Sequence, residues 1–205
     1  MKKVVFPVLY AAPIRYFLLL LQDNEIAFEK HENFVKSSFR NRTYVASPNG
    51  ALRLTIPIKG GKSKHQKYFD LLIDNTQEWQ KNHWQSLTTA YRSSAYFEYY
   101  EDDLYMFYHE TANSLFEFNM KLFEWLIRQL DFDVNFTYTD VYNEEIEPDH
   151  RKQFKTPVSD SLPPYYQVFE KKTAFIPGLS IYDLLFNLGP EAHSYLKNAC
   201  FIGKP

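Results

Sequence analysis

The sequence predicts an α/β fold, with α+β as the alternative, in which helices pack on a central sheet. The first thirty residues read as strand, loop, helix and strand, the order of an α/β unit. Two longer stretches, at about 76–93 and 111–130, carry apolar residues at helical spacing. With 205 residues, the chain is near the size at which one hydrophobic core serves the whole polypeptide, so we expect a single domain over residues 1–205.

The N-terminal unit begins with a short apolar strand, Val4–Phe6, that Pro7 ends. Pro13 suits the first turn of a helix, which runs to about Leu21, and the next strand is Ile26–Phe28. We expect the loop from Pro7 to Pro13 to open onto the end of the sheet. Loops at that end commonly bind ligands in α/β proteins.

A hairpin is predicted in the next part of the chain. Residues 52–58 alternate apolar and polar side chains, which is the two-residue period of a half-buried strand, and Pro57 places that strand near an edge. A second strand, 67–73, follows the break at Gly60 and Gly61. The loop between them, KGGKSKHQK, is flexible and positively charged.

Two helices and a strand follow. Asn75 or Thr76 can cap the first helix, in which apolar and aromatic residues recur every four positions. The second helix, 111–130, has a comparable apolar face. Residues 132–138 alternate as a strand does. The stripe on the first helix consists of Trp79, His83, Leu87 and Tyr91.

The C-terminal third starts with an acidic, proline-containing connection at about 140–164. Ser180, with Asp183 three residues later, is a plausible start for a last helix. Gly189 ends that helix before Pro190 opens another turn.

Composition narrows the classes of partner and compartment. The net charge of −2 gives no electrostatic reason to expect nucleic acid. Cys200 stands alone, so it forms no intramolecular disulfide, and we expect a reducing, cytoplasmic location. The uninterrupted apolar run Phe17–Leu21 is far shorter than the roughly 20 residues that span a bilayer, so no membrane span is expected.

Aromatic residues are unusually frequent, with 18 Phe, 16 Tyr and 3 Trp. They indicate either a tyrosine-rich core with an association surface, or a pocket that stacks flat or sugar-like ligands. The oligomeric state is not determined by the sequence.

Familiar cofactor and metal motifs are missing. Gly61-Lys62-Ser63 matches the end of a phosphate-binding loop, but Ile56 stands where its first glycine belongs, which favours a solvated lysine loop. The six histidines are dispersed and there is one cysteine, so we expect neither a metal nor another cofactor.

The segment from His31 to Arg42 gathers cations, amides and a carboxylate. On an extended backbone Arg40 and Arg42 point the same way, and together they could grip a carboxylate or phosphate. The alternative is an exposed polar connection in which Glu32 and Lys36 form an ordinary ion pair.

His83 and Tyr91 are candidate site residues on the helix that follows. His83 could serve as a general base, since an imidazole titrates near pH ~6.5, or it could be a partly buried structural histidine. Tyr91 could orient a ligand hydroxyl or place its phenol at the edge of the core.

These segments resemble the WbqC-like family over most of the chain, in the family's order. Asp23, Asn24 and Glu25, followed by Glu29, depart from the aspartates that the family often carries after its first helix. The matching stretches are Pro7-x-x-Tyr10-x-x-Pro13-x-x-Tyr16-Phe17, Glu32 to Arg42, Leu54 to Ile58, and Trp79-x-x-x-His83 with Tyr91, Phe97, Tyr99 and Tyr100.

The resemblance implies a role in O-antigen or other surface-polysaccharide biosynthesis, with transfer of glycine or a related acyl group to an amino sugar or sugar nucleotide. Arg40 and Arg42 would then hold an acyl-donor carboxylate or a sugar-nucleotide phosphate, and His83 would deprotonate the acceptor amine. The remaining substrate-binding residues would be Tyr10, Tyr16, Lys36, Asn41 and Tyr91.

Two other functions are compatible with the sequence. The first is a non-catalytic protein whose aromatic surface binds a partner enzyme or a sugar nucleotide. The second is a nucleotidyl-transfer enzyme, which only the strand-loop-helix opening suggests.

Overall fold

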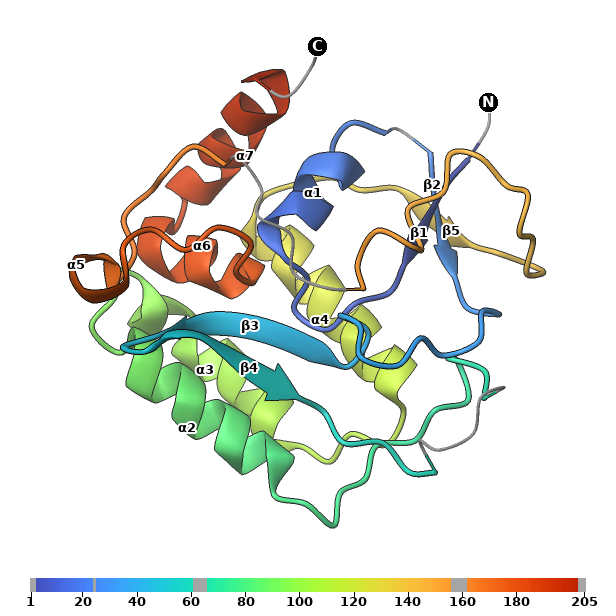
Figure 1. The fold of residues 1–205 in the computed structure, drawn as a ribbon, viewed down its shortest axis with the longest axis horizontal. Coiled ribbons are helices and arrows are strands. Elements are labelled where there is room, and N and C mark those ends of the chain that lie inside the picture. Colours follow the sequence, from blue (N-terminus) through green and yellow to red (C-terminus); the bar gives the residue numbers. More distant parts are fainter. Residues whose placement is uncertain (1–2, 24, 61–65, 156–161, 203–205) are drawn as a thin grey trace.

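The computed structural model describes residues 3–23, 25–60, 66–155 and 162–202 (Figure 1). Three strands form a parallel sheet in the order β1 (Val4–Pro7), β2 (Ile26–Glu29) and β5 (Phe136–Tyr138). Helix α1 (Ile14–Leu20) connects the first two strands. The predicted mixed α/β class and the N-terminal strand-loop-helix-strand unit are therefore confirmed.

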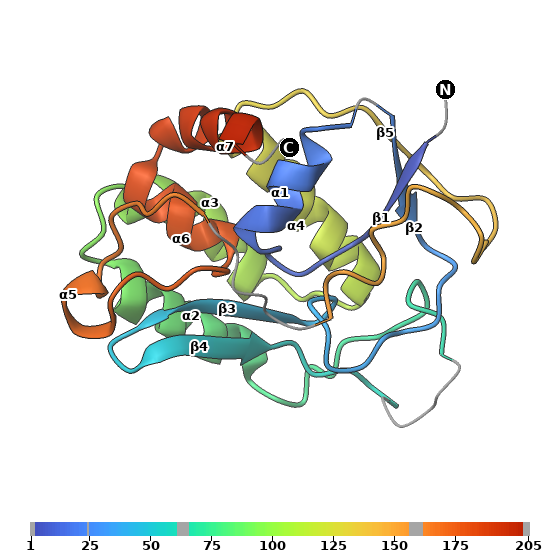
Figure 2. The same ribbon diagram turned by 45° about the horizontal axis from the view of Figure 1, so that its top comes forward.

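Helices α1 and α4 (Leu115–Gln129) cover the same face of this sheet (Figure 2). Phe17 of α1 stacks on Phe123 of α4 with ring centroids 6.4 Å apart. Phe123 also meets Phe28 of β2 edge-to-face at 4.9 Å. These aromatic contacts belong to one hydrophobic cluster that also includes buried residues of α2, α3, α6 and α7.

The hairpin has a different pairing from the predicted one. Strand β3 (Arg42–Ser47) pairs antiparallel with β4 (Gly50–Thr55), and the tight turn places Gly50 at φ +107°. The predicted partner strand 67–73 contributes only isolated bridges. The Pro-Asn-Gly turn and the β-branched and aromatic residues before it favour the observed hairpin. Residues 61–65 of the lysine loop lie outside the described residues.

Both predicted central helices exist, with shifted ends. Helix α2 spans Trp79–Tyr91 rather than 76–93, and α4 starts one turn later than predicted because Ser114 caps it by accepting a hydrogen bond from the Glu117 amide. Helix α3 (Phe97–His109) was not predicted. Its buried face consists of Phe97, Tyr100, Leu104 and Tyr108, which recur at helical spacing.

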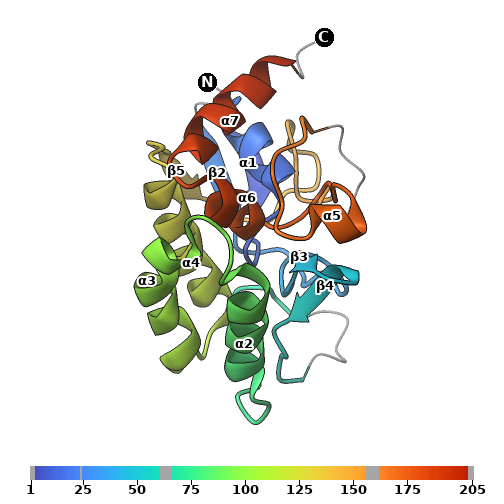
Figure 3. The same cartoon turned by 90° about the vertical axis from the view of Figure 1, so that its left-hand side faces the viewer.

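The described residues of the C-terminal third include the helices α5 (Glu170–Thr173), α6 (Ile181–Leu188) and α7 (Glu191–Ile202). Ser180 caps α6 and Gly189 ends it, as predicted. Gly189 and Pro190 form a turn, as predicted, and α7 begins directly after it at Glu191. Strand β5 is also shorter than predicted, because residues 132–135 contact the core without pairing in the sheet. Figure 3 shows α6 between α7 and the hairpin.

No helix in the described ranges is long and apolar enough to cross a membrane.

Candidate functional site

The loop between β1 and α1 is buried along its whole length, so the expectation that it opens onto the end of the sheet is wrong. Because this loop is buried, polar groups of the protein must satisfy its backbone carbonyls. The Tyr16 hydroxyl donates to the Pro7 carbonyl at 2.9 Å, and the Tyr68 hydroxyl donates to the Val8 carbonyl at 3.0 Å. The Ala11 carbonyl accepts from the hydroxyls of Thr43 and Ser180 at 2.8 and 2.9 Å. The loop thereby joins the sheet to the hairpin and to α6.

His83 lies at the end of a buried chain of phenols. The Tyr10 hydroxyl is 2.8 Å from His83 Nδ1 and 2.9 Å from the Tyr108 hydroxyl, which is 3.2 Å from that of Tyr182. The imidazole also hydrogen-bonds the backbone of Thr55. His83 is only 4% exposed.

Burial lowers the pKa of His83 to about 4, although the bond to the backbone of Thr55 opposes the shift. The imidazole is therefore neutral at pH 7. A carbonyl acceptor at Thr55 requires a proton on Nε2, so Nδ1 accepts from the Tyr10 hydroxyl. Both ring nitrogens are thus engaged within the protein, an arrangement typical of a structural histidine.

Arg40 is held in a buried ion pair. Its Nε and Nη2 donate to the two carboxylate oxygens of Glu32 at 2.6 and 2.5 Å, and Nη2 also donates to the carbonyl of Arg151. Arg40 is 1% exposed. Burial raises the pKa of Glu32, and the attraction of Arg40 opposes that shift. Glu32 is therefore paired with Arg40 and not with Lys36.

The other predicted site residues are dispersed. Asn41 is buried, and its Nδ2 donates to the carbonyl of Ile56 at 2.9 Å. Tyr91 is buried between the Ala46 amide and the Asp183 carboxylate. The Lys36 side chain is exposed. Arg42 is half-buried, and its Nε is shielded from solvent without a hydrogen-bond partner among the described residues.

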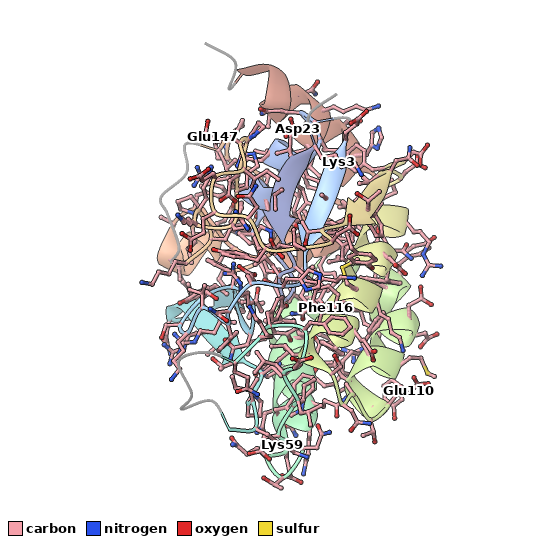
Figure 4. All side chains as sticks on the ribbon, turned by 90° about the vertical axis from the view of Figure 1, so that its right-hand side faces the viewer. Lys3, Asp23, Lys59, Glu110, Phe116 and Glu147 are labelled. Atoms are coloured by element: carbon pink, nitrogen blue, oxygen red, sulfur yellow. The ribbon has the colours of Figure 1, made fainter. Side chains whose placement is uncertain are left out.

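An open concavity lies at the carboxyl ends of the strands. It has a volume of about 400 Å³, and we call it the aromatic hollow. Figure 4 shows Phe116 at the end of the sheet opposite Lys3 and Asp23. Ligands of open α/β sheets bind outside the carboxyl ends of the strands. The residues that line the aromatic hollow are Lys30, Phe69, Phe116, Glu117, Met120, Lys121, Glu124 and Tyr138.

Three of the eight residues that line this hollow are aromatic. Phe116 and Met120 are buried at its floor, whereas Phe69 and Tyr138 are 47% and 40% exposed. The Phe116 ring lies 5.3 Å from that of Phe69 and 6.1 Å from that of Tyr138. The hollow thus presents ring faces and edges on which a flat or sugar-like group can pack.

Four charged groups surround these rings. Lys30 Nζ lies 5.8 Å from the centroid of Tyr138, within range of a cation–π contact. Lys121 lies on α4 between Glu117 and Glu124. In the described part of the chain, none of these four side chains forms a salt bridge. Their charges are therefore available to a ligand.

Glu29 fixes the strand ends that carry Lys30 and Tyr138. Its buried carboxylate accepts hydrogen bonds from Arg151 Nη1 at 2.8 Å, from Thr139 Oγ1 at 2.8 Å and from the amide of His31 at 2.7 Å. These bonds connect the residues that directly follow β2 and β5. The edge of the hollow is thus supported by a satisfied buried ion pair.

A second concavity, the α3–α4 groove, lies on the other side of α4 and has a volume of about 510 Å³. It shares Glu117, Lys121 and Glu124 with the aromatic hollow. Its own lining is more polar and includes Glu110, Thr111, Asn113, Ser114 and Arg128, with Met106, Phe107 and Phe118 below.

The sequence did not indicate the aromatic hollow, because its residues come from separate segments with no common motif. One signal was available: Tyr138 ends a predicted strand, and Lys30 lies two residues after the end of another, Ile26–Phe28. Within the described ranges, no three His, Cys, Asp or Glu side chains gather as possible metal ligands.

Comparisons with known proteins agree with the resemblance seen in the sequence. The model of the WbqC-like protein family matches residues 9–154, which is more than half of the chain. The "Uncharacterized protein Rv1507c" of Mycobacterium tuberculosis is 27% identical over 228 aligned positions, covering 96% of this chain and 98% of that protein. No solved structure matches.

Proposed function

Because this chain belongs to the WbqC-like protein family, we propose that it acts in surface-polysaccharide biosynthesis by binding a sugar nucleotide in the aromatic hollow. The observation that carries this proposal is an open hollow with three aromatic rings at the carboxyl edge of a parallel sheet. Its rim carries two lysines and two glutamates, none of which forms a salt bridge within the described ranges. An aromatic ring can stack on a nucleobase or sugar, and an ammonium group can bind a phosphate.

The buried motif residues support this location indirectly. Tyr10, Tyr16 and Arg40 already have protein partners at hydrogen-bonding distance, and each is at most 1% exposed. A ligand would have to break those contacts and open the core to reach them. The aromatic hollow needs no such rearrangement.

The proposal is tested by isothermal titration of the purified protein with uridine, guanosine, cytidine and deoxythymidine diphosphate sugars. We expect at least one of them to bind, and Phe69→Ala to weaken that binding about tenfold, since stacking on one base contributes about 1–3 kcal/mol. Tyr166→Ala is the matched control, because Tyr166 is 53% exposed and lines neither concavity.

Absence of binding by all four ligands would refute the proposal. Equal loss of affinity in Phe69→Ala and Tyr166→Ala would also refute it, because the effect would then not depend on the hollow.

A second candidate is the acyl or glycyl transferase that the family resemblance implies. The half-buried Arg42 favours it, because its Nε has no partner among the described residues and Arg42 pairs with Thr55 across the hairpin. The backbone of Thr55 in turn contacts His83. For His83 to act as a base, Tyr10 would have to release Nδ1.

His83→Gln and Arg42→Met should each abolish transfer of a labelled acyl group while leaving the protein folded. Unchanged turnover in both variants would exclude this site.

A further inference from the structure

The aromatic hollow and the α3–α4 groove are separated by one helix and share three charged residues of that helix. Glu117, Lys121 and Glu124 border both concavities. An α-helix with its side chains is about 10–12 Å across, so an extended ligand can reach from one side of α4 to the other.

The two concavities differ in chemistry. The aromatic hollow offers Phe69, Phe116 and Tyr138, which suit a flat nucleobase. The α3–α4 groove offers hydroxyl, amide and carboxylate groups from Thr111, Asn113 and others, which suit the hydroxyl groups of a sugar.

Lys121 is the cation common to both concavities. It lies between Glu117 and Glu124 along α4, whereas Lys30 borders only the hollow and Arg128 only the groove. A diphosphate that crosses α4 would therefore pass Lys121, with Lys30 and Arg128 on its two sides. Glu117 and Glu124 also border both concavities and repel a diphosphate, so Lys121, Lys30 and Arg128 are the groups that attract it.

We propose that α4 divides one bipartite site, in which a nucleoside diphosphate sugar places its base in the aromatic hollow, its diphosphate at Lys121 and its sugar in the α3–α4 groove. This assignment rests on the proposed function and specifies the orientation of its ligand. It also predicts which part of the ligand each concavity recognises.

The test compares three ligands with the same base: the nucleoside, the nucleoside diphosphate and the nucleoside diphosphate sugar. Their dissociation constants are measured by titration calorimetry on the full chain. Three variants each alter one subsite. Phe69→Ala alters the subsite for the base, Lys121→Met alters the subsite for the diphosphate, and Thr111→Trp alters the subsite for the sugar. Thr111 is exposed, so the tryptophan can block the groove without entering the core.

We expect Phe69→Ala to weaken all three ligands about tenfold. Lys121→Met should weaken the diphosphate and the diphosphate sugar about tenfold and leave the nucleoside unchanged. Thr111→Trp should weaken only the diphosphate sugar, to the affinity of the diphosphate. Lys81→Met is the control, because Lys81 is exposed on α2 and lines neither concavity.

One result would overturn the bipartite site: the nucleoside diphosphate sugar binds and Phe69→Ala lowers its affinity, but Thr111→Trp leaves that affinity unchanged. That result would leave the proposed function intact and place the sugar elsewhere. If no ligand binds, or if Phe69→Ala has no effect, the proposed function itself fails.

Discussion

The buried loop that follows β1 and the open hollow at the ends of β2 and β5 lie at the same edge of one sheet, yet they differ in almost every physical property. The loop carries the family's proline and tyrosine motif, and its polar groups are hydrogen-bonded within the protein. The hollow carries exposed rings and unpaired charges. The difference teaches that the residues of a recognisable motif can hold a fold together while neighbouring residues remain exposed, and it is these exposed residues that we propose as the ligand site.

The largest loss of stability is expected when the ion pair of Arg40 and Glu32 is broken. Arg40→Ala leaves a buried carboxylate without its partner, and we expect it to lower the free energy of unfolding by about 3–5 kcal/mol. Urea denaturation measures this change. The control is Lys81→Ala, which breaks the exposed pair with Glu78 and should cost at most about 1 kcal/mol. A similar decrease in the free energy of unfolding in Arg40→Ala and Lys81→Ala would mean that Arg40 is not part of the structural core.

His83 should give a pH-dependent effect. Its folded pKa of about 4 lies below the unfolded value of 6.5, so the unfolded chain binds more protons between these values and the wild type gains stability as the pH rises from 4 to 6.5. His83→Gln should lack this gain, which is about 3 kcal/mol.

The gain is measured as the difference between wild type and His83→Gln, because Asp183 acts in the opposite direction. Burial raises the pKa of Asp183 to about 6, so its contribution to stability falls as the pH rises from 3.8 to 6. Both proteins contain Asp183, and its contribution cancels in the difference. A difference that does not change with pH would show that His83 titrates normally and is open to solvent.

A smaller loss is expected when one hydrogen bond to the buried loop is removed. Tyr16→Phe leaves the carbonyl of Pro7 without its donor, which should cost about 1–3 kcal/mol in thermal or urea unfolding. Tyr99→Phe, at a residue that is 77% exposed, is the control and should change stability by less than about 0.5 kcal/mol. An unchanged stability of Tyr16→Phe would contradict the structural role of the motif tyrosine.

The smallest effect on stability is expected in the hollow. Phe69 is 47% exposed, so Phe69→Ala should change the free energy of unfolding by less than about 1 kcal/mol. Circular dichroism during heating measures this change. A loss as large as that of Arg40→Ala would mean that Phe69 belongs to the core and not to a binding surface.

The sequence was sufficient for elements whose apolar periodicity is strong and local. Helices α2 and α4 were found in this way, whereas prolines marked the opening strand-helix-strand unit and Ser180 and Gly189 marked the ends of α6. Helix α3 was missed although Phe97, Tyr100, Leu104 and Tyr108 recur at helical spacing, because Phe97 and Tyr100 entered the prediction only as part of the family resemblance. The pairing of β3 with β4 was missed because no strand is predicted at 42–47, so that 67–73 was the expected partner of 52–58.

The candidate site was harder to predict for a different reason. Lys30, Phe69, Phe116 and Tyr138 are brought together by the parallel pairing of β2 with β5 and by the position of α4. No short-range pattern contains that information. The burial of His83 and Arg40 likewise depends on tertiary packing, so the sequence left a functional and a structural role open for both.

The central claim is that ligand recognition belongs to the open hollow and not to the buried motif. The most direct measurement is the affinity of a nucleoside diphosphate sugar for Phe69→Ala and for His83→Gln, determined by calorimetry at pH 7.5 on variants shown to be folded. We predict that Phe69→Ala loses about tenfold in affinity while His83→Gln binds like the wild type. Loss of binding in His83→Gln with unchanged affinity in Phe69→Ala would contradict the claim.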